Sequence, residues 1–240
     1  MSSNSKRFIN AYNLIDQTLR SIHGYKRNMT FSDMIRRSVS VNSVVRKYED
    51  KLIDYARLRN AIIHNSNDSR VIAEPHIQVV DEMEKIARLI STPPLAMNGI
   101  AKKEVLTLDH STSLKKLIET IGQSGFKNIP IYRDEMMIGV VNSARLVEDL
   151  GHKIAEGVEV DAYIANTPIN TIVREDDINN YYCIRSERLT IQEALDLFFT
   201  KRKLQVIVIT PQGNYLQSPV GIVTVADIID MNDIIENYAV

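Results

Sequence analysis

Two segments of similar sequence, GVVNSAR at residues 139–145 and GIVTVAD at residues 221–227, decide the fold of the second half of this 240-residue chain. Each segment contains the second strand of a hairpin-like pattern and leads into a helical apolar pattern. A capped amphipathic helix precedes each hairpin, beginning at Thr112-Ser113 in the first copy and at Thr190 in the second. Internal duplication of an α-β-β-α unit is therefore the most specific organisational signal in the chain.

The duplicated unit resembles a tandem pair of CBS domains, known as a Bateman module, over residues 98–235. Repeat one lies at about 98–152 and repeat two at about 170–235. The resemblance implies a regulatory module that performs no chemistry itself. It also implies an adenosine-containing ligand (AMP, ADP, ATP or S-adenosylmethionine) in the cleft between the repeats, and assembly into a homodimer.

The second repeat keeps the family's G-h-x-T-x-x-D phrase, in which h is an apolar residue. The resemblance implies that Thr224 offers its hydroxyl to a phosphate beside free helix N–H groups, and that Asp227 accepts both ribose hydroxyls. It places the base near Arg185 and along Val206 and Ile207. The alternative for the first two residues is an ordinary helix start, with Thr224 as N-cap and Asp227 as an acid in the first turn.

The first repeat departs from this phrase, since Asn142 stands at the Thr position and Arg145 at the Asp position. A guanidinium has no acceptor for ribose hydroxyls, so we expect one ligand site rather than two. Arg145 is instead expected to reach a phosphate of a ligand held by the other repeat. The acids Asp176 and Asp177 fall in an apparent linker, where we expect them to be solvated.

Residues 1–93 show the apolar spacing of four amphipathic helices, which predicts a small bundle. The helices are expected at residues 8–22, after Thr30, at 41–64 and at 76–90. Pro93-Pro94 then marks a domain boundary. The predicted fold class is thus α plus α/β, a helical bundle followed by a duplicated α-β-β-α pair.

The third predicted helix contains Arg59, Asn60 and His64 near its end. Arg59 falls within the apolar stripe, so it must bind a carboxylate, cover the bundle with its stem, or face a cleft or a partner chain. The R-N-x-x-x-H spacing resembles the signature of HEPN domains, many of which are dimeric, metal-independent endoribonucleases. The resemblance implies His64 as general acid/base, Arg59 as stabiliser of phosphorane charge, and Asn60 as the residue that orients both. The structural alternative is a favourable helix-end His and an Arg held by an acid.

Charge is unevenly distributed, because residues 1–95 carry a balance of +5 and the remainder a balance of −6. A basic first part permits an anionic partner such as RNA. The single cysteine, Cys183, excludes an internal disulfide, and the five scattered histidines predict no metal site. No apolar run has the length of a bilayer span or of a signal peptide, so we expect a cytoplasmic protein without a membrane partner.

Three functions fit these patterns. The first is an adenine-nucleotide-sensing CBS pair attached to a HEPN-like effector that binds or cleaves RNA. The second is a non-catalytic ligand sensor whose helical domain only dimerises or docks a partner. A transcriptional regulator ranks last, because the chain has no helix-turn-helix phrase.

Overall fold

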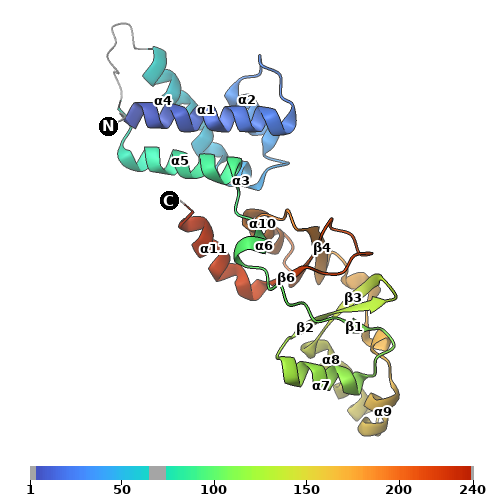
Figure 1. Cartoon of the computed structure of the whole chain (residues 1–240). Coiled ribbons are helices and arrows are strands. Elements are labelled where there is room, and N and C mark those ends of the chain that lie inside the picture. Colours follow the sequence, from blue (N-terminus) through green and yellow to red (C-terminus); the bar gives the residue numbers. More distant parts are fainter. Residues whose placement is uncertain (1–3, 65–73, 239–240) are drawn as a thin grey trace. The chain divides into compact units, whose positions relative to one another are not determined.

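The computed structural model describes residues 4–64 and 74–238 and divides the chain into two compact units (Figure 1). The first unit contains the helices up to Pro94, with two short segments at residues 190–193 and from Met231 onward. The second contains the rest, from Leu95 to Asp230, and holds the β-structure. The predicted order of a helical region followed by a duplicated α/β region is confirmed. Within the described residues, none of the helices combines the length and apolarity needed to cross a bilayer.

The first unit is built from five helices among the residues described up to Pro94: α1 (Asn4–His23), α2 (Phe31–Ser38), α3 (Ser43–Lys47), α4 (Glu49–His64) and α5 (Ile77–Ser91). The prediction of one continuous helix over residues 41–64 is wrong. The backbone leaves the helical region at Tyr48, where φ is −114° and ψ is 18°, although its N–H still bonds the Val44 carbonyl at 3.1 Å. The changed ψ redirects the chain and separates α3 from α4.

The core of this unit lies where α1 packs against α5 (Figure 1). Apolar residues on one face of α1 are buried at the predicted spacing, namely Phe8, Tyr12, Ile15 and Leu19. The ring of Phe8 meets Tyr55 of α4 edge-on, with centroids 5.7 Å apart, and Tyr12 stacks on Phe31 of α2 at 4.1 Å. These aromatic contacts join α1 to α4 and to α2.

The second unit contains two three-stranded sheets of the same topology. In each, the first strand pairs parallel with the second, and the second pairs antiparallel with the third. The strands are β1 (Leu108–Asp109), β2 (Asn128–Arg133) and β3 (Met136–Asn142) in one sheet, and β4 (Tyr182–Ser186), β5 (Val206–Thr210) and β6 (Gly221–Thr224) in the other. Both predicted hairpins are confirmed, whereas the parallel strands β1 and β4 were not predicted.

Helices complete each repeat of the second unit. Around the first sheet these are α7 (Leu114–Ser124), α8 (Ser143–Ala155) and α9 (Val160–Asn166), and α6 (Ala96–Gly99) lies at the start of the unit. After β4 and β6 come α10 (Ile191–Thr200) and α11 (Ile228–Glu236), of which residues 191–193 and 231–236 are grouped with the first unit. The duplication is visible in the backbone bonds. Ser143 N–H donates to the Lys127 carbonyl at 3.2 Å, and Val225 N–H makes the matching bond to Gln205 at 3.1 Å. Both strand-to-helix junctions are therefore held in the same way.

Gly139 and Gly221, the first residues of the two repeated segments, each pack against a side chain from outside their own repeat. A Cβ at Gly139 would lie 2.6 Å from Cγ1 of Val173, and a Cβ at Gly221 would lie 2.6 Å from Sδ of Met97. Met97 lies just before repeat one, and Val173 lies near the start of repeat two. Each repeat is thus covered by the segment that introduces the other, and only glycine leaves room for that cover.

Candidate functional site

The junction of β6 and the following helix places Thr224 and Asp227 together. Thr224 precedes the short 3₁₀ turn Val225–Asp227 and forms a reciprocal capping box with Asp227. The backbone N–H of Thr224 donates to Oδ2 of Asp227 at 2.7 Å, and its hydroxyl donates to the same oxygen at 3.0 Å. Asp227 is buried, with 9% of its surface exposed. The ordinary capping role is therefore present, and it uses only one of the two carboxylate oxygens.

Strand register brings one predicted wall residue to this junction and separates the others from it. Val206 pairs directly with Thr224 across β5 and β6. Ile207 is buried, but its side chain points to the opposite face of the strand from Val206. Arg185 pairs with Ile209, three positions further along β5, and its guanidinium donates to the Ile184 carbonyl at 2.7 Å. Of the three, only Val206 lies beside Thr224 in the register.

At the matching junction of the first repeat, Arg145 forms a buried ion pair with Asp177. Nη2 of Arg145 lies 3.0 Å from Oδ1 of Asp177, and Nη1 contacts Oδ2. The side chains are only 12% and 10% exposed. The hydrogen bonds that its guanidinium donates to Asp177 raise the pKa of Arg145. The prediction that Asp177 is solvated is wrong, because a guanidinium withdrawn from water needs a carboxylate beside it.

Further hydrogen bonds join the polar side chains at this first junction. Asn142 caps α8 by accepting the Arg145 N–H at 2.7 Å. The hydroxyl of Tyr181 donates to Oδ1 of Asn128 at 2.7 Å, and burial raises the pKa of Tyr181. Asn128 pairs with Asn142 in the sheet. The Arg145 guanidinium, expected to meet a ligand phosphate, is held within the chain. Sequence reasoning missed Asp177 and Tyr181, and only the unusual Arg145 signalled that a partner was needed.

In the helical unit, the structure brings together Arg59 and Asn60 of the predicted catalytic set. The Arg59 guanidinium lies 5.4 Å from the ring centroid of Tyr12, and Nη1 donates to Oδ1 of Asn60 at 3.3 Å. Nε of Arg59 is buried and has no hydrogen-bond partner among the described residues. Burial raises the pKa of Tyr12 to about 12. His64 is the last residue of α4, and its side chain lies outside the described residues.

Residues 98–152, the region of the first repeat, match the CBS domain family. No curated protein matches the chain. Similar solved structures include CBSX2 in complex with AMP, which is 12% identical, covers 60% of this chain and 99% of its own, and has a TM-score of 0.43. The CBS domain pair of MJ0100 with 5′-methylthioadenosine and S-adenosyl-L-methionine is 15% identical, with coverages of 59% and 97% and a TM-score of 0.44. The CBS domain of a bacterial CNNM/CorC Mg²⁺ transporter with ATP is 16% identical, with coverages of 64% and 96% and a TM-score of 0.43.

Proposed function

We propose that this chain is a cytoplasmic, homodimeric regulator with two domains. Residues 98–235 act as a tandem CBS pair, with repeats at 98–152 and 170–235, that binds AMP, ADP, ATP or S-adenosylmethionine. Residues 1–93 act as a HEPN-like effector that binds or cleaves RNA without a metal. The observation that carries the ligand site is the buried carboxylate of Asp227, half of which is not used by its helix cap.

The chemistry of the second junction suits an adenosine ligand. Oδ1 of Asp227 is an acceptor that the cap does not use, and a carboxylate accepts from a vicinal diol without a competing donor. The Thr224 hydroxyl takes part in the cap, and it donates to a phosphate when its proton turns away from Asp227. Val206 supplies an apolar wall beside it. The first junction lacks this acceptor because its polar groups satisfy one another, which supports one site per chain.

In the effector, the proposed roles follow the HEPN resemblance. His64 moves a proton at the 2′-hydroxyl or at the leaving oxygen, Arg59 stabilises the phosphorane charge, and Asn60 orients both. Ligand bound at Asp227 biases how two CBS pairs associate and so how two Arg59–His64 segments face each other. This coupling is a two-state equilibrium that both sites influence.

One observation favours the alternative, a sensor whose helical domain only dimerises or docks. The Arg59 guanidinium is already placed over Tyr12 and bonded to Asn60, which is how a structural arginine covers a bundle. In that case Arg59 supports the helical core and His64 has no chemical role.

Calorimetric titration with AMP, ADP, ATP and S-adenosylmethionine tests the ligand site. Asp227→Asn is the matched variant, because its amide oxygen can keep the cap while an NH₂ group replaces the free acceptor. We expect affinity for the best ligand to fall at least tenfold while thermal unfolding of the free protein changes little. Equal affinity in the variant, or no heat from wild type with any ligand, rejects the site.

Incubation with structured RNA in EDTA, beside a His64→Ala control, tests the effector. Cleavage by wild type that is lost in His64→Ala supports the nuclease. Equal cleavage by both preparations refutes it. Binding without cleavage, with or without the adenosine ligand, supports the non-catalytic alternative.

A further inference from the structure

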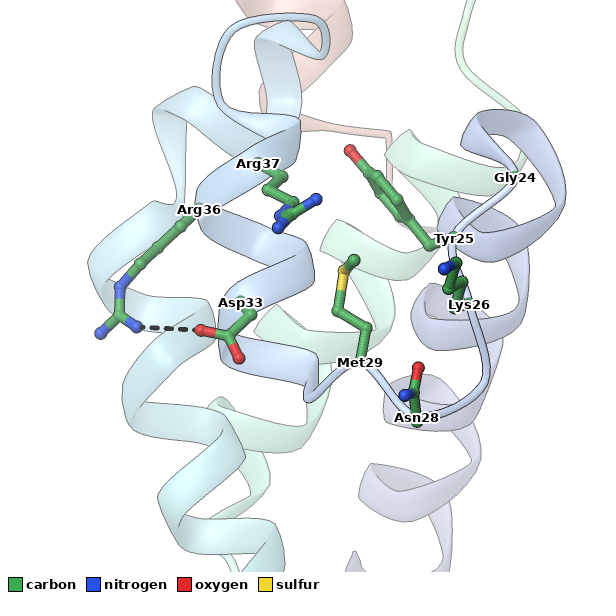
Figure 2. Close-up of a pocket in the computed structure, with 8 residues that line it drawn as sticks. All are labelled: Gly24, Tyr25, Lys26, Asn28, Met29, Asp33, Arg36 and Arg37. Carbon is green, nitrogen blue, oxygen red and sulfur yellow. Dashed lines mark ion pairs between the residues drawn. The ribbon is translucent and has the colours of Figure 1, made fainter.

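A pocket of about 640 Å³ lies between the loop that follows α1 and the helix α2 (Figure 2). It is formed by one short stretch of the chain and involves none of the residues assigned a role above. Its lining combines three basic residues and one acidic residue with an amide, an aromatic ring, a thioether and a glycine: Gly24, Tyr25, Lys26, Asn28, Met29, Asp33, Arg36 and Arg37.

The charge of this pocket is positive and only weakly neutralised. Its lining holds three basic side chains, Lys26, Arg36 and Arg37, and one acid, Asp33, a formal balance of +2. The acid, Asp33, contacts Arg36 at 3.6 Å, and both side chains are more than half exposed. Within the described part of the chain, Lys26 and Arg37 have no carboxylate in salt-bridge contact. Figure 2 shows the Arg37 guanidinium directed from α2 into the space in front of Tyr25 and Met29. A bound anion would supply the missing counter-charge.

The opposite wall offers a flat ring and a soft side chain. Tyr25 and Met29 are half-buried and line the pocket. The hydroxyl of Tyr25 accepts a hydrogen bond from the buried Ser38 Oγ at 3.2 Å, which fixes the ring against α2. An aromatic ring beside unpaired arginine and lysine groups is the combination that holds a nucleobase and its phosphates.

The loop is held in place from behind, so the pocket is preformed. Arg20 is paired with Asp16 at 2.7 Å, and its remaining N–H groups donate to the carbonyls of Lys26 at 2.6 Å and Met29 at 2.9 Å. These bonds fix both ends of the Lys26–Met29 turn. Because the cations stand on a fixed frame, less conformational entropy is lost when a ligand binds.

We propose that this pocket binds single-stranded nucleic acid, with a base against Tyr25 and Met29 and the flanking phosphates on Lys26, Arg36 and Arg37. The inference rests on the RNA-binding part of the proposed function and places contact at residues outside the Arg59–His64 segment. The cavity is far larger than a phosphate ion needs, and cations on two of its sides suit a backbone that passes through it. Arginine forks match phosphate oxygens in a bidentate manner.

Fluorescence anisotropy with a labelled single-stranded RNA, titrated at several salt concentrations, tests this site. The variant Lys26→Glu/Arg37→Glu reverses two exposed charges; Lys115→Glu/Lys116→Glu on α7 makes the same net charge change at exposed residues elsewhere. We expect the first variant to lose at least tenfold in affinity. Its log–log salt slope should be shallower by about 1.4, since each phosphate contact on a single strand contributes about 0.7. The α7 variant should change neither quantity by as much.

A second pair of variants separates base stacking from charge. Tyr25→Leu should weaken RNA binding at least about fivefold, the lower end of what one base–aromatic stack contributes. Tyr25→Phe keeps the ring and should bind like wild type. Inorganic polyphosphate, which has no bases, should bind Tyr25→Leu and wild type alike.

The outcomes distinguish this pocket from the wider proposal. Equal RNA binding by wild type and Lys26→Glu/Arg37→Glu overturns the pocket and leaves RNA binding by the helical domain standing. An equal loss in the α7 control also overturns it, because the effect is then the field of the whole protein. Unchanged binding by Tyr25→Leu overturns the nucleobase contact. No RNA binding by wild type rejects both the pocket and the RNA part of the proposed function, whereas the adenosine site is decided separately by calorimetry.

Discussion

The buried pair of Arg145 and Asp177 allows a quantitative test of what holds the second unit together. Arg145→Leu leaves the Asp177 carboxylate buried without its two guanidinium contacts. Breaking such a pair from one side costs about 3–5 kcal/mol. Asp177→Leu should cost a similar amount, because it leaves the guanidinium alone. The double variant Arg145→Leu/Asp177→Leu removes both charges and should lie within about 1.5 kcal/mol of wild type, since well-packed apolar replacements of buried pairs are often neutral.

Urea denaturation of the full chain, followed by circular dichroism, measures these differences at neutral pH. A single-variant cost below about 1 kcal/mol would show that the pair is solvated. A double variant as unstable as the sum of the single ones would show that packing rather than charge pairing decides the effect.

Three further predictions concern the same unit. Gly139→Ala should lower stability by about 1–3 kcal/mol through overpacking, because its Cβ would lie 2.6 Å from Val173 Cγ1; adding Val173→Ala should restore most of the loss in thermal unfolding, and no restoration would refute the contact. Burial raises the pKa of Tyr182 from 10.0 to about 12. The stability that Tyr182 contributes as a protonated phenol is therefore complete below pH 10 and is lost between pH 10 and 12. Alkaline titration of phenolate absorbance should show late-titrating tyrosines whose number Tyr182→Phe reduces, and an unchanged titration curve would contradict this. Burial also raises the pKa of the Cys183 thiol, so alkylation should be slow in the folded protein and fast in urea, whereas equal rates would place the thiol at the surface.

Much of the fold could be predicted because periodicity reports it directly. The hairpins follow from β-branched runs around turn residues, and the longer helices follow from apolar positions three and four residues apart. Strand β1 has only two residues, too few for any period to show. The bend at Tyr48 was missed because no Pro or Gly stands there and the apolar spacing continues through it.

The candidate sites were predictable to a different extent. Thr224 and Asp227 are three residues apart, so a short sequence motif contains both residues of the capping box. The partner of Arg145 is 32 residues away, and no local pattern connects the two. The pocket between Tyr25 and Arg37 depends on the path of the loop that connects α1 to α2. That path is set by Arg20, whose bonds to backbone carbonyls carry no sequence signature.

The packing at Gly139 and Gly221 has a consequence for how the duplicated half behaves as a whole. Met97 and Val173 each lie against the sheet of the opposite repeat, so the residues that cover the third strand of each repeat come partly from outside that repeat. Lys102 extends this exchange by bonding the Ile222 backbone in both directions, at 3.0 and 3.1 Å. The packing of each repeat therefore depends on residues next to or within the other. A fragment that contains one repeat alone lacks some of the side chains that cover its sheet. A change that displaces Met97 or Val173 should therefore be felt at the third strand of the opposite repeat.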